Sequence, residues 1–249
     1  MTWWHGVLIA FAGLWAGTIN TVVGSGTLVT FPVLVALGHP PVTATTSNAI
    51  GLIPGAVTGA YGYRHELVGQ RRRLVRYAVA SLFGAIAGTA LLLSLPQDAF
   101  ETVVPALVGL SVLLVAIQPL LAKHLRAGTG TRRAGPLLYV WIFLVGTYGG
   151  YFTAAQGIML IGVMGLLVED SLQRLNGIKN ALTAVVNIVA GAVYAFVAPI
   201  SWPVVGLLAV SSTLGGLIGA RIGRRLPPAV LRWTVVVIGV VAVGWLLVR

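Results

Sequence analysis

The hydrophobic positions of this chain gather into long apolar stretches that are separated by short polar connections. The stretches cover residues 4–23, 27–37, 43–63, 75–95, 101–121, 136–153, 157–168, 177–197, 203–221 and 229–248. Most of them approach the roughly 20 residues that a helix needs to cross the hydrocarbon core of a membrane. The stretches 27–37 and 157–168 are too short for this, and each follows a glycine-containing interruption. The pattern predicts an all-α polytopic membrane protein with two broken or re-entrant helices.

The composition supports this class and argues against others. Hydrophobic residues make up 57% of the chain and charged residues 8%, whereas soluble domains carry roughly 25% charged residues. There is no cysteine, and the four histidines, His5, His39, His65 and His124, are scattered over loops and the N-terminus, so we expect no metal site. A membrane-embedded enzyme is therefore disfavoured. The chain contains no Walker-type ATP-binding motif, so we expect no cofactor, and any energy for transport would come from gradients.

The sequence contains a weak internal repeat, which predicts two similar halves. A shift of 131 residues superposes Gly26 on Gly157, Gly84 on Gly215, Gly88 on Gly219 and Pro96 on Pro227, and a shift of 132 pairs Asn48 with Asn180 and Gly59 with Gly191. Weak similarity of this kind is typical of transporter repeats. We expect a first transmembrane repeat over 1–121, a cytoplasmic linker over 122–135 and a second repeat over 136–249. Each repeat would contain about five segments, with the broken or re-entrant helices in its first hairpin.

Basic residues predict the orientation of the chain in the membrane. Four loops contain 15 of the 16 basic residues: Arg64, Arg71, Arg72, Arg73 and Arg76; Lys123, Arg126, Arg132 and Arg133; Arg174 and Lys179; Arg221, Arg224, Arg225 and Arg232. The positive-inside rule assigns these loops to the cytoplasm. The basic loop 64–76 corresponds by the repeat to the neutral loop 196–207, so the two halves would have inverted topology. Both termini are then external in a multi-pass protein of the cell (inner) membrane, whether the short hairpins cross fully or are re-entrant.

The net charge of +11 has two interpretations. Contact with the anionic cytoplasmic leaflet of the lipid bilayer is favoured, because the Arg71-Arg72-Arg73 run lies near a helix end. No nucleic acid partner is expected, because the sequence shows no basic face with interleaved aromatic residues. A homodimer is left open.

The two interruptions are the first candidates for a binding site. Gly24-Ser25-Gly26-Thr27 separates the first two stretches, and Tyr148 to Gly157 separates their counterparts. Short helices starting near Thr27 and Ile158 would direct unpaired N–H groups toward a cavity and attract an anion. The backbone or hinge glycines would be Gly24, Gly26, Gly149, Gly150 and Gly157. The alternative is that glycines only permit close helix packing. For the Gly84–Gly88 and Gly215–Gly219 pairs, this packing role and a binding role are equally supported by the sequence.

Polar residues follow each short helix and complete the predicted substrate-binding set. Its members carry hydroxyl, amide or ammonium groups that can donate hydrogen bonds to an oxyanion. They are Ser25, Thr27, Thr46, Ser47, Asn48, Gln156, Asn176, Lys179, Asn180 and Asn187. Two alternatives stay open: Thr46, Ser47 and Asn176 could cap helices, and Lys179 could snorkel to the cytoplasmic surface instead of contacting the ligand.

The same residues carry a resemblance to a known family. Asn20 to Pro32, with Ala44-Thr-Thr-Ser-Asn48, resembles the first-half signature of the sulfite exporter TauE/SafE family, although Ser25 stands where a glycine is expected. Tyr148 to Gly157 and Leu175-Asn-Gly-Ile-Lys-Asn180 resemble the second-half signature, with Thr153 in place of a frequent glycine. The resemblance covers essentially the whole chain. It implies a multispanning transporter of small anions such as sulfite, sulfoacetate or other organosulfonates.

From the residues and the resemblance together, we predict a secondary transporter of a small sulfur-containing anion. It would work by alternating access around a site near the midplane of the membrane. A passive anion channel, a structural scaffold and a transporter of a carboxylate or another non-sulfur oxyanion are the alternatives.

Overall fold

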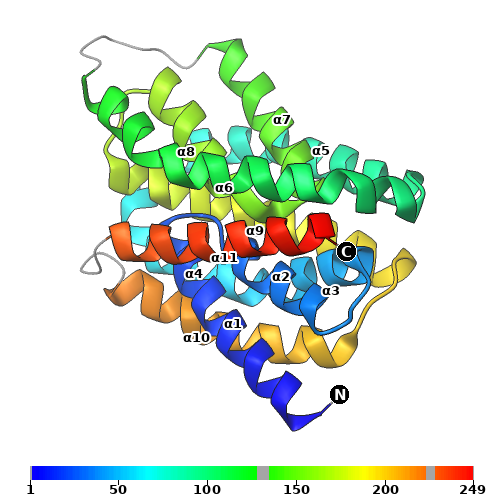
Figure 1. Ribbon diagram of the computed structural model, residues 1–249. Helices are drawn as coiled ribbons and strands as arrows, with labels where there is room; N and C mark the ends of the chain where they lie inside the picture. Colours follow the sequence, from blue (N-terminus) through cyan, green and yellow to red (C-terminus); the bar gives the residue numbers. More distant parts are fainter. Residues whose placement is uncertain (1, 128–134, 223–227, 249) are drawn as a thin grey trace.

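The computed structural model describes residues 2–127, 135–222 and 228–248, and every regular element in these ranges is a helix (Figure 1). The first part contains α1 (Trp3–Val22), α2 (Thr27–Ala36), α3 (Pro41–Gly51), α4 (Ile53–Gly62), the 3-10 turn η1 (Arg64–Leu67), α5 (Arg71–Ser94) and α6 (Gln97–Ala127). The second part contains α7 (Pro136–Tyr151), the 3-10 turn η2 (Thr153–Ala155), α8 (Gln156–Leu167), α9 (Leu172–Val197), α10 (Trp202–Ile222) and α11 (Pro228–Val248). The predicted all-α fold class is confirmed.

Several helices are long and apolar enough to cross a membrane. Within the described residues these are α1, α5, α9, most of α10 and the 98–118 part of α6. They expose large apolar side chains on their outer surfaces, such as Phe11 on α1 and Phe196 on α9, of which 66% and 89% are accessible. Water would penalise such exposure, whereas lipid does not. The chain is a multi-pass membrane protein.

One predicted stretch is divided into two helices. The stretch 43–63 is divided into α3 and α4 at Leu52, because Pro54 lacks the N–H that would bond to the carbonyl four residues earlier. The helix α6 continues to Ala127, past residue 121, where the first repeat is expected to end, and the division of the chain into two repeats and a linker stays a prediction. Part of that linker, with Arg132 and Arg133, and also Arg224, Arg225 and Pro227, lies outside the described residues.

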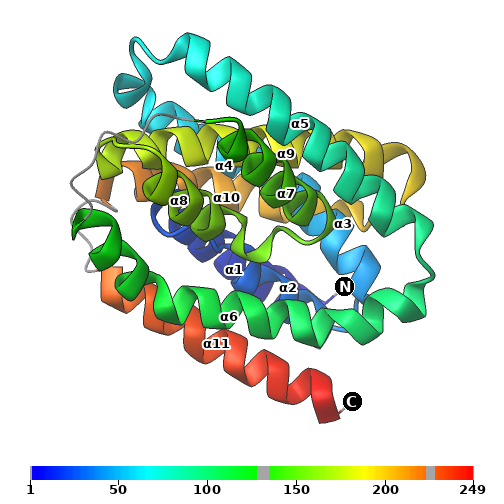
Figure 2. The ribbon, with the colours of Figure 1, turned by 90° about the horizontal axis from the view of Figure 1, so that it is seen from above.

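Helices of the first part pack against helices of the second part in two matching pairs. In Figure 1 the α5–α7 pair lies at the top and the α1–α10 pair at the bottom, with α3, α4 and α9 between them. The helices α6 and α11 run alongside each other in both views (Figures 1 and 2). These pairs are the ones that a duplicated sequence would give, and the inverted relation between the halves stays a prediction.

Small residues let the paired helices approach closely. A Cβ atom added at Gly84 or Gly88 of α5 would overlap the backbone carbonyls of Phe143 and Thr147 on α7. The matching contact between α10 and α1 uses the Gly215–Gly219 pair, where an added Cβ would overlap the carbonyls of Leu14 and Thr18. Close packing is therefore the role of these four glycines.

Each short hairpin returns to the side on which it starts. His5 lies at the start of α1 and His39 follows α2. Burial lowers the pKa of His39, and so does the charge of His5, which must therefore lie nearby. In the second hairpin, Tyr139 near the start of α7 and Val168 just after α8 line the same pocket. Each hairpin thus starts and ends on the same side, as both two full crossings and a re-entrant loop would require.

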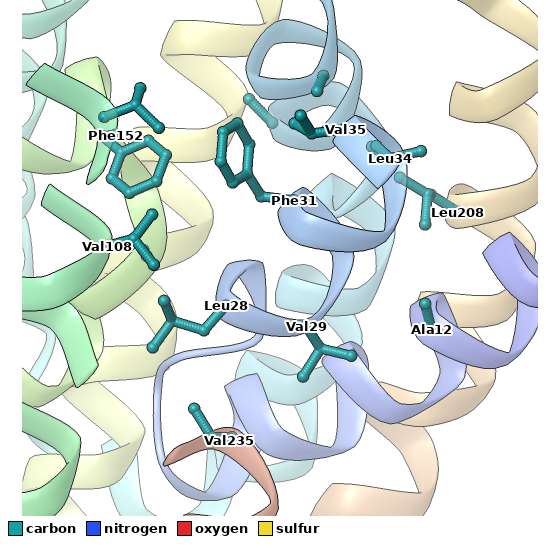
Figure 3. Packing of buried hydrophobic residues seen from close by; sticks show 14 of the residues in the cluster. Ala12, Leu28, Val29, Phe31, Leu34, Val35, Val108, Phe152, Leu208 and Val235 are labelled. Atoms are coloured by element: carbon teal, nitrogen blue, oxygen red, sulfur yellow. The ribbon is translucent and has the colours of Figure 1, made fainter. Parts of the chain in front are cut away.

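Aromatic residues join the two hairpins in the core. The rings of Phe31 on α2 and Phe152 after α7 meet edge to face with centroids 5.1 Å apart (Figure 3). Phe100 of α6 contacts Phe152 and Tyr151 with centroid distances of 6.3 and 5.5 Å. Edge-to-face contacts add to the stabilisation that burial of the rings provides. This cluster fixes the position of the two interruptions against α6.

Candidate functional site

The two interruptions meet backbone to backbone. The N–H group of Gly157, at the start of α8, donates a hydrogen bond of 3.1 Å to the carbonyl of Gly24, which lies between α1 and α2. Gly24 has φ of 94°, a conformation that side-chain-bearing residues rarely adopt. A Cβ atom on Gly157 would lie 2.5 Å from the Cα atom of Gly24, so the contact requires glycine at this position.

Two predicted residues flank this contact with unpaired polar atoms. Ser25 follows Gly24, and Gln156 precedes Gly157. Both side chains are fully buried, with 0% exposure. The Ser25 hydroxyl and both polar atoms of the Gln156 amide have no hydrogen-bond partner in the described part of the chain. Buried polar groups are nearly always hydrogen-bonded, so unpaired ones at a helix break indicate a place for a ligand or water.

Asn48 is engaged with the first short helix. Its side-chain amide donates to the Thr27 hydroxyl at 3.0 Å, and its oxygen accepts a hydrogen bond from the Thr30 hydroxyl. Thr27 and Thr30 lie one turn apart on α2, so both hydroxyls face α3. Thr30 was not among the predicted residues, and its spacing of three from Thr27 is the signal that could have found it. The cluster ties α2 to α3 beside the interruption.

Lys179 and Asn180 of α9 bind the end of α1. The Lys179 ammonium donates to the carbonyls of Asn20 and Thr21 at 2.9 and 3.0 Å, and the Asn180 amide donates to the Thr21 carbonyl at 3.2 Å. The last carbonyls of a helix lack partners within it and attract positive charge, which explains this pairing. Lys179 is fully buried, so the alternative that it snorkels to the surface is wrong.

Further along the same face of α9 lie two unpaired polar residues. Thr183 and Asn187 follow Lys179 at intervals of four residues and therefore share its face. Both are buried, and neither the Thr183 hydroxyl nor the Asn187 amide has a partner in the described part of the chain. Thr183 was missed by the sequence prediction, although the four-residue spacing marks it.

The end of α9 contacts the second interruption. The Tyr194 hydroxyl donates a hydrogen bond to the carbonyl of Gly150 near the end of α7. A Cβ atom on Gly150 would overlap Ala85 of α5, and one on Gly149 would lie 2.6 Å from the Gln156 amide. α9 thus supports the end of α1 with Lys179 and the end of α7 with Tyr194. Gly26 likewise permits close contact, in its case with Ala16 of α1.

Three predicted residues lie apart from the interruptions or have other partners. Thr46 and Ser47 bond to the α9–α10 connection, through the carbonyl of Pro199 at 2.6 Å and the N–H of Ser201 at 2.9 Å. Asn176 is half-buried in the second turn of α9. The capping alternative is wrong for all three, because α3 begins at Pro41 and Ser171 provides the cap of α9. Thr45, which precedes them, is buried with an unpaired hydroxyl.

These features define a class of protein. No group of three or more potential metal ligands occurs among the described residues. Broken helices that meet inside a membrane bundle, with buried polar side chains around them, are the architecture of secondary transporters. Residues 9–246 match the sequence profile described as "Sulfite exporter TauE/SafE". The chain belongs to the TauE/SafE family of membrane transporters.

Curated relatives have the same character. The "Probable membrane transporter protein YfcA" of Escherichia coli (strain K12) is 27% identical over 224 residues, which are 89% of this chain and 80% of the relative. "Probable membrane transporter protein ORF9" of Sinorhizobium sp is 24% identical over 226 residues, with 88% and 82% covered. A "Probable membrane transporter protein" of Haemophilus influenzae is 22% identical over 227 residues, with 90% and 88% covered. All three carry names of membrane transporters, and none is named as an enzyme.

Proposed function

We propose that this protein transports a small sulfur-containing anion, such as sulfite, sulfoacetate or another organosulfonate, through a site where its two interruptions meet. The observation that carries the proposal is the set of buried polar side chains without partners around the Gly24–Gly157 contact. Ser25 and Gln156 flank that contact, and Thr183 and Asn187 extend the set along α9. The family match supports the substrate class.

The chemistry of the site suits an oxyanion. Hydroxyl and amide groups donate hydrogen bonds to sulfonate or sulfite oxygens, and each such bond is strengthened when the acceptor is charged. In the described part of the chain, the N–H groups of Ser25, Gly26 and Thr27 at the start of α2 have no acceptor. In its protonated form, Lys179 would add positive charge nearby and a third N–H group beyond the two that bind α1. The anion would thus be bound by neutral donors with one charge close by.

Alternating access would require the two hairpins to separate and rejoin. They touch through one backbone hydrogen bond, a glycine pair and the edge-to-face contact of Phe31 with Phe152, and separation would have to break these contacts. α9 binds the ends of both α1 and α7 and would couple their movements. Exposure of Ser25, Gln156 and Asn187 is 0 to 1%, which corresponds to a state closed to both sides of the membrane. We expect the cytoplasmic side to be the one that carries the basic loops.

A thermal-shift screen of the purified chain tests the substrate class. Sulfite, sulfate, thiosulfate, sulfoacetate, taurine and carboxylates would be compared at equal ionic strength. A ligand at 100 times its Kd stabilises a fold by about 2.7 kcal/mol, which for a chain of this size corresponds to roughly 5–10 °C. We expect a sulfur oxyanion or organosulfonate to give the largest shift. Equal, small shifts with all anions would count against a sulfur-selective site.

Two variants test the location of the site. Gln156→Leu and Asn187→Leu remove unpaired buried amides, so the protein without ligand should keep or gain stability. The same variants should lose most of the ligand-induced shift. Gln173→Leu, an exposed glutamine on α9, is the matched control and should respond like the parent. If both buried variants keep the full ligand-induced shift, the anion binds at a different place in the protein.

Counterflow into proteoliposomes distinguishes a carrier from the alternatives. Saturable uptake that is accelerated by the same anion inside supports a carrier. Unsaturable flux supports a channel, and the absence of flux supports a scaffold. The buried Lys179→Ala and Asn48→Ala variants are expected to weaken uptake.

A further inference from the structure

A second site, separate from the interruptions, lies where α5 begins. A pocket of about 440 Å³ is lined by Arg72, Arg73 and Arg76 together with Gly69, Tyr77, Tyr139 and Val168. It brings together the start of α5, the start of α7 and the end of α8. We propose that this pocket binds the phosphate group of an anionic phospholipid headgroup.

The arginines of the pocket fall into two kinds. Arg73 is held in place: it donates to Asp170 at 2.6 Å and to the Tyr77 hydroxyl at 3.0 Å, while its second terminal nitrogen is buried without a partner in the described chain. Arg72 and Arg76 are exposed, lie one turn apart on α5, and have no carboxylate within ion-pair distance among the described residues. One fixed and two unpaired guanidinium groups provide the planar donors that bind phosphate oxygens.

The surroundings of the pocket select a lipid over a free anion. Val79 and Phe83 continue the stripe of Arg72 and Arg76 along α5 at helical spacing, and both are about half exposed. Leu137 and Val140 of α7 are also exposed beside the pocket-lining residue Tyr139. In Figure 2, α5 runs along the outer edge of the molecule, with α7 next to it. The surface thus changes from basic to apolar within one turn, as a headgroup with acyl chains requires.

The position of the pocket gives the bound lipid a structural consequence. Tyr139 lies near the start of the α7–α8 hairpin and Val168 directly follows its end, and Tyr139 packs against Tyr77 of α5 with ring centroids 5.6 Å apart. A phosphate in the pocket would link both ends of the hairpin to α5. Binding should therefore stabilise the fold measurably.

The test uses the full chain in detergent, with native mass spectrometry and thermal unfolding as readouts. Phosphatidylglycerol, phosphatidylcholine and inorganic phosphate would be added separately. We expect phosphatidylglycerol alone to give a bound adduct and a raised Tm. In the double variant Arg72→Gln with Arg76→Gln, affinity should fall on the order of 30-fold, because each arginine near an anionic lipid contributes about 1 kcal/mol and 1.4 kcal/mol is tenfold.

The control is the double variant Arg64→Gln with Arg71→Gln, which removes the same charge from exposed arginines that do not line the pocket. It should keep the parent's affinity. An equal loss in both double variants would overturn the proposal in favour of general surface charge. An equal shift with inorganic phosphate, lost in the same arginine variant, would overturn the lipid assignment. Equal binding of phosphatidylcholine would overturn the role of the anionic headgroup. Should the double variant unfold, Arg76→Gln alone must still weaken binding.

Discussion

Replacing Gly157 by alanine tests the contact on which the proposed site depends. The new Cβ atom would lie 2.5 Å from the Cα atom of Gly24, whereas ordinary contact begins at 3.4 Å. The hairpins must therefore move apart, and the hydrogen bond of 3.1 Å from the Gly157 N–H to the Gly24 carbonyl is lost. Overpacking costs about 1–3 kcal/mol and the lost bond about 1 kcal/mol. We expect destabilisation of about 2–4 kcal/mol and loss of anion uptake.

Thermal unfolding followed by tryptophan fluorescence measures the stability part, and proteoliposome counterflow measures the transport part. Gly109→Ala on α6 is the matched control, because a Cβ atom there meets nothing within 4 Å. That variant should keep uptake and be as stable as the parent or more stable by up to about 1 kcal/mol. The reasoning is refuted if Gly157→Ala unfolds at the same temperature as Gly109→Ala and transports normally.

Three further substitutions test other contacts that hold the helices together. Gly88→Ala should force α5 and α7 apart and cost about 1–3 kcal/mol, whereas Gly206→Ala, with open space around it, should not lower the Tm. Tyr194→Phe removes one buried hydrogen bond to the Gly150 carbonyl and should cost about 1 kcal/mol in chemical unfolding; an unchanged midpoint would contradict that bond. Asp170→Asn breaks the ion pair with Arg73, in which the side chains of Arg73 and Asp170 are only 23% and 6% exposed, and should lower the Tm because the other charge is left unpaired; an unchanged Tm would contradict a stabilising ion pair.

Much of the architecture could be predicted from the sequence, because a membrane imposes strong rules on composition and length. Apolar stretches identified the membrane helices, and glycines marked both interruptions, since regular helices rarely contain such runs. The start of α2 at Thr27 and of α8 at Gln156 agree closely with the prediction. The division at Leu52 was missed, because the prediction gave no weight to Pro54 within the stretch 43–63.

The predicted binding residues differ in whether their polar groups have partners within the protein. Ser25, Gln156 and Asn187 are buried and unpaired, as a binding role would need, but Asn48 and Lys179 have partners within the protein. A side chain's partner depends on residues far away in the chain, such as the carbonyls of α1 for Lys179. No local pattern reveals such a partner. Thr30 and Thr183 were overlooked, although their spacing of three from Thr27 and of four from Lys179 places each on the same helix face as a predicted residue.

The sequence alone therefore determined the class of protein, its helical segments, the two glycine interruptions and the family resemblance, because each depends on hydrophobicity, length or short motifs. Only the tertiary structure decided that the interruptions touch through Gly24 and Gly157, and which polar groups are already paired. Several of these contacts join residues more than a hundred positions apart, such as Lys179 and Asn20. Such contacts are fixed by the packing of whole helices and not by their local composition.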